Sequence, residues 1–224
     1  GQVHFHLCQL SRMLKRWVDI IGAIAGLVTL APVLLAVTLI VLCSMGRPVL
    51  FRQCRPGLHH KPFVLVKFRT MSNSCDGDGA LFDDGQRLTR VGRFLRGASL
   101  DELPELWNVL RGDMSLVGPR PLLPQYLDRY TPRQARRHEV RPGLTGWAQV
   151  NGRNAISWED RFELDVWYVD NQSLALDLKI ILMTVVRLIR PRDINASDAA
   201  TMTEFKGSGR ELGACPGQAA ISKE

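Results

Sequence analysis

The sequence predicts a helix-rich α/β fold with a small β-hairpin or sheet, behind an N-terminal membrane-anchoring helix. Three observations lead to this prediction. The segment from Ile20 to Met45 holds no charged residue, an alternating segment follows a Pro-Gly turn, and later segments repeat apolar residues at the helical period. These patterns are typical of a membrane segment, a hairpin and amphipathic helices, respectively.

The composition is that of an ordinary globular protein with an excess of basic residues. The 224 residues are 46% hydrophobic and 23% charged, which excludes a disordered chain and a fully membrane-embedded one. The net charge of +7 suits an anionic partner: nucleic acid, an acidic lipid surface or a phosphorylated small molecule. Five cysteines without a CxxC pair indicate reduced thiols facing a cytoplasm, and the histidines lack metal-ligand spacing.

Residues 17–46 are predicted to anchor the chain in a membrane, after a basic N-terminal segment, 1–16. The charge-free run exceeds the roughly 20 residues that cross a bilayer. Pro32 near its middle cannot donate a backbone hydrogen bond, so a kink or break is expected there. Basic residues flank both ends, which leaves two alternatives open. One is a kinked transmembrane helix, and the other is a re-entrant helix-break-helix that enters and leaves on one face.

A strand pair and a loop follow the anchor. Residues 48–57 and 61–70 are expected to form the strands, because residues 63–68 alternate in the β pattern and Pro56-Gly57 marks a turn. Residues 71–86 are rich in Gly, Ser and Asp and are predicted to form a loop. A basic helix ending at Gly97, a second short helix and a Gly/Pro loop come next.

Three helices are predicted in the second half of the chain, at 126–140, 157–171 and 174–190. The first two are amphipathic. The third carries few charges and suits either the core or the membrane interface. The tail, 191–224, is rich in Gly, Ser and Ala and is predicted to be flexible.

The adjacent acids Asp101 and Glu102 allow two interpretations. Ser99 and Glu102 form an S-x-x-E capping box, which would make both acids the N-terminal residues of a helix. Alternatively, they form a metal or nucleophile site. Basic side chains before and after the pair favour this site, because Arg and Lys recognise phosphate and a carboxylate holds Mg²⁺ together with substrate phosphates. These basic residues are Lys67, Arg69, Arg90, Arg93, Arg96 and Arg120.

Acids, basic residues and an anchor together fit phosphoryl transfer from a soluble phosphorylated donor to a lipid, with a carboxylate as nucleophile. A solvated basic face against anionic headgroups is the simpler explanation of the arginines. Nucleic acid is not expected as a partner, because the tryptophans lie in apolar or amphipathic patterns and not within a basic stripe.

Five stretches resemble a known family when taken in order: VKFRTM, LTRVGRFLR, SLDELPELWNVLRGDMSLVGPRP, RHEVRPGLTGWAQVNGR and FELDVWYVDN. With the anchor, from about Trp17 to Pro191, the chain resembles the bacterial sugar transferases. These are monotopic phosphoglycosyl transferases that start glycan assembly on a polyprenyl carrier. The small single-domain members are the most similar.

The resemblance implies transfer of a sugar 1-phosphate from a UDP-sugar to undecaprenyl phosphate, with Mg²⁺, giving undecaprenyl-diphospho-sugar and UMP. It implies that Asp101 attacks the phosphate and forms a covalent phosphosugar intermediate. Glu102 would share the metal with Asp101 and help to activate the acceptor. The product would initiate a glycoprotein, capsule or O-antigen type of glycan, and the resemblance to small members favours an N-acetylated amino sugar.

The resemblance extends to further residues. Lys67, Arg96, Arg120 and Arg153 match positions that engage phosphates or nucleotide, and Asp165 matches an acid of the site. The domain 47–190 would be the cytoplasmic catalytic domain, with interfacial amphipathic helices.

The resemblance also implies a re-entrant anchor broken at Pro32, with both ends on the cytoplasmic face of the bacterial inner membrane. This chain has Ala31 where small members carry a serine, which removes one hydroxyl that could bond freed carbonyls. Membrane phospholipids are expected partners. Downstream glycosyltransferases and a second copy of the chain are compatible with this interpretation.

Two non-enzymatic alternatives remain. One is a membrane-surface interaction protein of the same fold that has lost the chemistry, and the intact acid pair argues against it. The other is a basic module that binds lipid surfaces without turning over a UDP-sugar.

Overall fold

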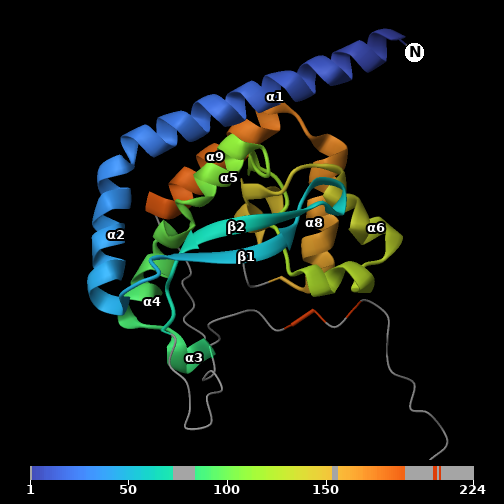
Figure 1. The fold of residues 1–224 in the computed structure, drawn as a ribbon. Helices are drawn as coiled ribbons and strands as arrows, with labels where there is room; N and C mark the ends of the chain where they lie inside the picture. Colours follow the sequence, from blue (N-terminus) through green and yellow to red (C-terminus); the bar gives the residue numbers. More distant parts are fainter. Residues whose placement is uncertain (1, 73–83, 153–155, 190–203, 206, 208–224) are drawn as a thin grey trace, which may run out of the picture.

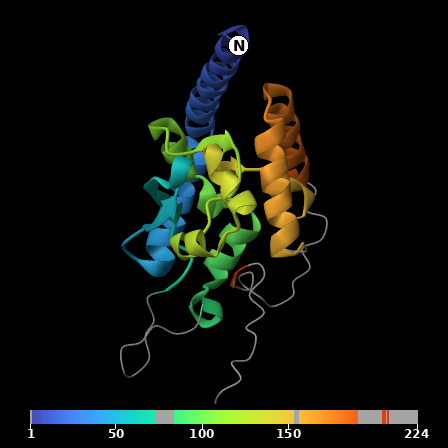
Figure 2. The same ribbon diagram turned by 90° about the vertical axis from the view of Figure 1, so that its right-hand side faces the viewer.

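The structure is a computed structural model, and it describes residues 2–72, 84–152, 156–189, 204, 205 and 207. Figure 1 shows the long helix α1 lying across one side of the domain, α2 descending along its edge, and a β-hairpin between α2 and the helices α6 and α8. Figure 2, turned by 90°, shows α1 and the C-terminal helices extending beyond the rest of the domain. The predicted helix-rich α/β class is confirmed.

The elements have the following bounds. The helices are α1 (Gln2–Thr29), α2 (Ala31–Met45), α3 (Asp84–Arg87), α4 (Arg90–Gly97), α5 (Glu105–Arg111), α6 (Pro132–Ala135), α7 (Trp147–Asn151), α8 (Trp158–Asn171) and α9 (Leu174–Ile189). Short 3₁₀ turns are η1 (Leu58–His60), η2 (Leu100–Glu102), η3 (Pro124–Arg129) and η4 (Arg136–Glu139). The strands are β1 (Leu50–Pro56), β2 (Pro62–Phe68), β3 (Ser115–Val117) and β4 (Gly143–Thr145).

The N-terminal helix breaks next to Pro32, as predicted. α1 ends at Thr29, and α2 begins at Ala31, so Pro32 lies in the first turn of α2, where its missing N–H costs no helical hydrogen bond. The two helices meet at 62°. No single helix in the described part of the chain is long and apolar enough to cross a bilayer, whereas Leu10–Thr29 and Ala31–Met45 together have the length and composition. Most of the basic segment 1–16 belongs to α1 and is not a separate element.

The predicted strand pair is a hairpin. β1 pairs with β2 in antiparallel register, from Leu50 opposite Phe68 to Pro56 opposite Pro62. A second, parallel pair joins β3 to β4 and brings the Gly/Pro loop after β3 close to residues 141–146. Gly118 and Gly143 allow this approach, because a Cβ on Gly143 would lie 2.0 Å from the Gly118 nitrogen.

Four groups of buried side chains fill the spaces between the elements. The first group lies between α1, β2 and α5 and consists of Ala23, Phe63, Leu65, Leu106, Val109 and Met114. The second lies between α2, β2 and α4 and consists of Val37, Val41, Phe68 and Leu95. The third lies between β3 and α7 to α9 and consists of Val117, Val150, Tyr168 and Ile180, and the fourth, beside η3 and α8, consists of Leu122, Tyr126, Phe162 and Phe205. Each group joins segments that are distant in sequence.

The helix predicted at 126–140 is wrong. This segment forms η3, α6 and η4, because Tyr130 takes extended angles of φ −74° and ψ 141°. Thr131 then caps α6 with a capping box that includes Gln134, and Pro132 begins the helix. The cap at Thr131 and the proline at 132 start a new helix within the segment, although its apolar residues recur at the helical period.

The helices predicted at 157–171 and 174–190 are confirmed as α8 and α9. One face of α9 is buried, in agreement with the core interpretation, and the placement of the other face at a membrane interface stays a prediction. Ile180 is fully buried, whereas Leu178, Leu182 and Val186 are each more than half exposed. Within the predicted flexible tail the structure describes Glu204, Phe205 and Gly207, and Phe205 is packed against the domain.

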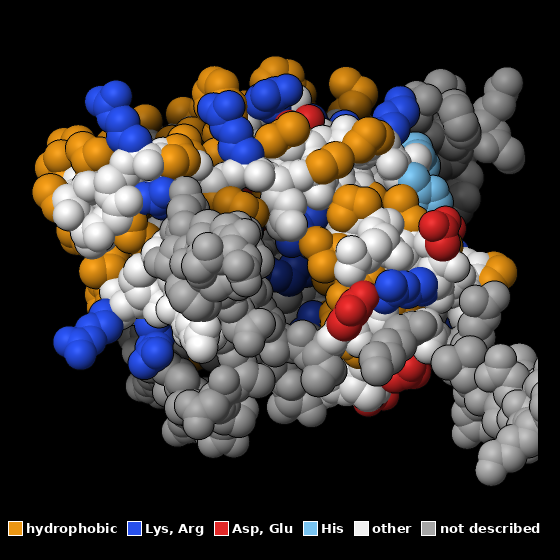
Figure 3. Space-filling view, turned by 60° about the horizontal axis from the view of Figure 1, so that its bottom comes forward, with side chains coloured by type: hydrophobic (Ala, Val, Ile, Leu, Met, Phe, Trp, Pro, Cys, Tyr) orange, Lys and Arg blue, Asp and Glu red, His pale blue; other side chains and the backbone are white. Residues whose placement is uncertain are grey.

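The face of the domain opposite α1 is hollowed. Figure 3 shows Lys and Arg side chains deep inside a hollow near the middle of this face, with apolar and acidic side chains beside it. A basic hollow of this kind suits an anionic ligand.

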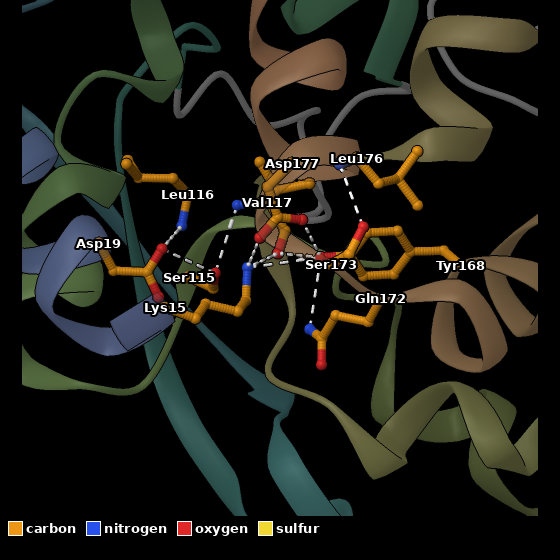
Figure 4. A network of polar contacts seen from close by, with 10 residues as sticks. All are labelled: Lys15, Asp19, Ser115, Leu116, Val117, Tyr168, Gln172, Ser173, Leu176 and Asp177. Atoms are coloured by element: carbon orange, nitrogen blue, oxygen red, sulfur yellow. Dashed lines mark hydrogen bonds and ion pairs between the residues drawn. The ribbon is translucent and has the colours of Figure 1, made fainter. Parts of the chain in front are cut away.

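Buried charges attach α1 to the domain (Figure 4). Lys15 Nζ lies 2.5 Å from Asp177 Oδ2 of α9 and 3.1 Å from the Val117 carbonyl of β3. One turn later, Asp19 Oδ1 accepts hydrogen bonds from Ser115 Oγ at 2.9 Å and from the Leu116 N–H at 3.0 Å. We call these residues, with Tyr168, the α1 network. They hold the amino-terminal helix against both β3 and α9.

The first testable prediction concerns this network. Lys15→Met would leave the buried Asp177 without a counter-charge among the described residues, with only the hydrogen bond from Tyr168 Oη remaining, which typically lowers the free energy of unfolding by about 3–5 kcal/mol. Chemical denaturation measures this quantity. The control is Arg12→Met on the exposed side of the same helix, which should change stability by less than about 1 kcal/mol. Equal stability of the Lys15 and Arg12 variants would contradict the assigned role.

Candidate active site

The acid pair lies in a short turn and not at the start of a capped helix. Asp101 and Glu102 belong to η2, between α4 and α5. Ser99 takes left-handed angles of φ 55° and ψ 21° and makes no side-chain capping bond. The capping box predicted for Ser99 and Glu102 is therefore absent. The Glu102 side chain is directed to basic residues instead.

One oxygen of Glu102 contacts two cations. Its Oε1 lies 2.9 Å from Lys67 Nζ and 2.5 Å from Arg120 Nη2. Lys67 is also 2.9 Å from Glu105 Oε1, outside hydrogen-bonding geometry. The turn η2, the strand β2 and the loop after β3 thus converge on a single carboxylate.

Asn108 holds the strand that carries Lys67 against α5. Its Nδ2 donates to the Val64 carbonyl at 2.7 Å, and its Oδ1 accepts from the Val66 N–H at 3.1 Å. Asn108 is fully buried and lies one turn after Glu105 in α5. These bonds position Lys67 and Glu105 relative to each other.

Asp101 is a buried carboxylate with no hydrogen bond or ion pair to the residues that the structure describes. Burial raises its pKa and the adjacent Glu102 raises it further, whereas Lys67, Arg96 and Arg120 act in the opposite direction. A buried carboxylate without a direct partner, near three cations, has the character of a nucleophile for an anionic substrate.

The two neighbouring glutamates differ in charge at neutral pH. Burial alone would raise the pKa of Glu102, but Arg120 and Lys67 lower it to about 2. Burial raises the pKa of Glu105 to about 7, an effect that Lys67 opposes and Glu102 reinforces. Glu102 is therefore ionised under ordinary conditions, and Glu105 exchanges its proton near neutrality.

The other predicted site residues lie farther from the pair. Arg96 donates through Nε to Thr70 Oγ1 at 3.1 Å and influences Asp101 through its charge. Asp165 lies behind the site, where its Oδ2 is 2.8 Å from Arg137 Nη2. Arg137 in turn donates to the Arg120 carbonyl at 2.7 Å. Arg153 lies outside the described residues.

Two residues of the site were not predicted from the sequence. Glu105 follows Glu102 by three positions, a spacing that could have indicated a shared face. Arg137 supports Arg120 from a segment predicted to be an ordinary amphipathic helix, and the only signal for it is its place at the start of the stretch RHEVRPGLTGWAQVNGR.

The donor atoms fit a cation held together with substrate phosphates. Among the described residues, no group of three or more His, Cys, Asp or Glu side chains could hold a metal alone. Both cations contact Oε1 of Glu102, so its Oε2 and the Asp101 carboxylate are available within the described part of the chain. Mg²⁺ usually takes one or two carboxylates and completes its shell with water and phosphate.

Comparison with known proteins identifies the family of this chain. The family model described as bacterial sugar transferase matches residues 10–191. The chain belongs to the bacterial sugar transferase family. The match includes α1 from Leu10, the acid pair, the loop with Arg120 and all of α9.

Several curated relatives of this bacterial sugar transferase are clearly similar. A Bacillus subtilis protein named "Uncharacterized sugar transferase EpsL" is 55% identical over 197 residues, covering 88% of this chain and 98% of the relative. A Caulobacter vibrioides UDP-glucose:undecaprenyl-phosphate glucose-1-phosphate transferase is 46% identical, covering 78% of this chain and 69% of the relative. The Escherichia coli protein of the same name is 41% identical, covering 81% of this chain and 41% of the relative.

The second prediction concerns Glu105. Between its ordinary pKa of 4.5 and the value of about 7, this carboxyl keeps its proton in the folded chain and loses it in the unfolded one. The folded state is therefore penalised as the pH rises through this range. Glu105→Gln removes that penalty, so its stability relative to wild type should grow by about 3 kcal/mol between pH 5 and pH 8.

Chemical denaturation across this pH range measures the difference. Glu163→Gln is the control, because this glutamate is exposed, pairs with Arg133 and has a pKa below its ordinary value. The difference in the free energy of unfolding between Glu163→Gln and wild type should not change between pH 5 and pH 8. The prediction would be contradicted if the free energy of unfolding of Glu105→Gln relative to wild type were also the same at pH 5 and pH 8.

Proposed function

We propose that the chain transfers a sugar 1-phosphate from a UDP-sugar to undecaprenyl phosphate, giving undecaprenyl-diphospho-sugar and UMP. The observation that carries the proposal is the buried carboxylate of Asp101 beside Glu102, with Lys67 and Arg120 converging on the latter. The names of the Caulobacter and E. coli relatives describe this type of transfer for UDP-glucose.

In the first step an oxygen of Asp101 attacks the phosphorus that carries the sugar. The bond between this phosphorus and the oxygen bridging to the uridylyl phosphate breaks, and UMP leaves with that bonding pair. The sugar phosphate remains on Asp101 as an acyl phosphate. Lys67, Arg96 and Arg120 offset the negative charge of the donor phosphates, which is the main contribution a protein makes in phosphoryl transfer.

In the second step a phosphate oxygen of the lipid attacks the same phosphorus. The bond to Asp101 breaks, the product diphosphate forms and the carboxylate is restored. Glu102, with a pKa of about 2, is a weak proton acceptor. We therefore assign it to holding cations and orienting the acceptor.

Mg²⁺ is the proposed cofactor. Asp101 and Oε2 of Glu102 would hold it together with donor phosphates. When bound, it offsets charge on the phosphates and on the departing UMP.

The bent pair α1–α2 supports a re-entrant anchor. Pro32 and the 62° bend divide the apolar segment, and both flanks carry basic residues. Arg69 donates to the carbonyls of Met45 and Gly46, which fixes the end of α2 beside the strand of Lys67. A chain that enters and leaves on the cytoplasmic face of the inner membrane would place Asp101 near the headgroups, where the lipid phosphate lies.

The product would begin a glycoprotein, capsule or O-antigen type of glycan. The names of the relatives include three different sugars: glucose, galactose and N-acetylgalactosamine. For this chain our hypothesis is an N-acetylated amino sugar.

The third prediction tests the transfer and its nucleophile. Wild type, incubated with undecaprenyl phosphate, Mg²⁺ and a panel of UDP-sugars, should release UMP with at least one sugar. Asp101→Asn should lower this rate by about a thousandfold or more, because an amide cannot form the covalent intermediate. The control is Asp170→Asn, an exposed carboxylate paired with Arg136, with an expected rate within twofold of wild type.

An Asp101 variant that releases UMP at the wild-type rate would exclude this residue as nucleophile. A folded wild type that is silent with every sugar would overturn the proposed function and favour a membrane-surface interaction protein.

The fourth prediction concerns the metal. EDTA should abolish UMP release, and Mg²⁺ in excess over EDTA should restore it, because the donor phosphates require a counter-charge beyond the local cations. Activity that is unchanged in EDTA would remove Mg²⁺ from the proposal.

A further inference from the structure

Phe205 lies beyond residue 191, where the family match ends, yet it is one of the best-buried side chains of the described chain. Only 2% of its surface is exposed. Its ring packs on Phe162 at a centroid distance of 4.9 Å and on Tyr126 at 5.7 Å, both edge to face. Trp158 and Tyr130 complete the surroundings at 5.7 and 6.0 Å. We call these five rings the aromatic group.

Polar contacts fix the backbone at this position. The Phe205 N–H donates to Tyr126 Oη at 3.3 Å, and Arg129 donates to the Phe205 carbonyl. Arg129 also pairs with the preceding Glu204 at 2.8 Å, and Gln125 donates to the same oxygen at 3.1 Å. Side-chain burial and backbone bonds together specify one position for Phe205, which incidental contact of a tail would not do.

The aromatic group is connected to Arg120 through Leu122 and Arg137. Leu122, two residues after Arg120, belongs to the same buried cluster as Phe205. The guanidinium of Arg137 lies over the rings of Tyr130 and Phe162, at 5.8 and 5.6 Å. Arg137 donates at 2.7 Å to the carbonyl of Arg120, whose side chain reaches Glu102.

We propose that Phe205 is a positioning residue for the transfer reaction. By filling the aromatic group it holds the loop 118–123 and Arg137 in place, and through them the Arg120 side chain against Glu102. The inference rests on the proposed function. It adds a residue from outside the family domain to those that determine the geometry of the site. Phe205 touches neither the acid pair nor the cations that contact it.

The first test measures UMP release by variants of the full chain, well below the thermal midpoint of each. Phe205→Ala leaves a cavity behind Leu122 and should lower kcat about tenfold or more. Phe205→Leu, which keeps most of the volume, should remain within about threefold of wild type. Phe94→Ala, the same change at an exposed side chain of α4, serves as the control and should match wild type.

A double-mutant cycle separates positioning from a general loss of stability. If Phe205 acts through Arg120, Phe205→Ala should lower kcat by less than about threefold when Arg120 is already Lys. The same factor in both backgrounds would overturn the proposal. So would a folded Phe205→Ala variant with the wild-type kcat.

Hydrogen exchange tests the geometry without any reaction. The amides of Gly143 and Tyr126 report on this loop, because they donate to the carbonyls of Pro119 and Leu123. Phe205→Ala should accelerate their exchange about tenfold or more and leave 63–68 unchanged, and Phe205→Leu should have little effect. Unchanged exchange at these two amides would overturn the positioning role. If wild type turns over no UDP-sugar while this acceleration is seen, the proposed function fails and the positioning of the Arg120 loop by Phe205 stands.

Discussion

Oxygen Oε1 of Glu102 is the point on which the architecture of the site depends. Lys67 comes from the hairpin and Arg120 from the loop after β3, and both contact this one atom. Lys67 and Arg120 are both half-buried, and the turn η2 presents Glu102 between them as a shared counter-charge. Asp101, the preceding residue, makes no ion pair with the residues that the structure describes. Glu102 therefore pairs with both cations, and the Asp101 carboxylate remains available to a substrate.

Directional polar contacts join the α1–α2 pair to the site. Lys15 and Asp19 tie α1 to β3 and α9, and Arg16 donates to the Val109 and Leu110 carbonyls at the end of α5. Arg69 holds the end of α2, two residues after Lys67. An apolar segment could pack against a domain in many registers, but these directional contacts permit one. The position of the acids relative to the α1–α2 pair is therefore set by these contacts.

Much of this structure could be predicted from the sequence, and the failures have physical causes. Pro32, the hairpin and the helices α8 and α9 follow from local rules on proline, alternation and helical period. The predicted helix at 126–140 failed because Tyr130 and Thr131 impose an extended residue and a new cap. The S-x-x-E pattern at Ser99 failed as a capping box because Glu102 gains more from two cations than from one backbone N–H. The roles of Arg137 and Phe205 depend on contacts between segments distant in sequence, which no local pattern contains.

Asn108 has a consequence for the outer edge of the hairpin. A strand edge with free N–H and C=O groups is open to pairing with another chain. On β2, the side chain of Asn108 occupies the carbonyl of Val64 and the N–H of Val66, which a third strand would otherwise use. The sheet therefore ends at two strands on that side. The hairpin is thereby protected at this edge from the strand-to-strand association that starts aggregation.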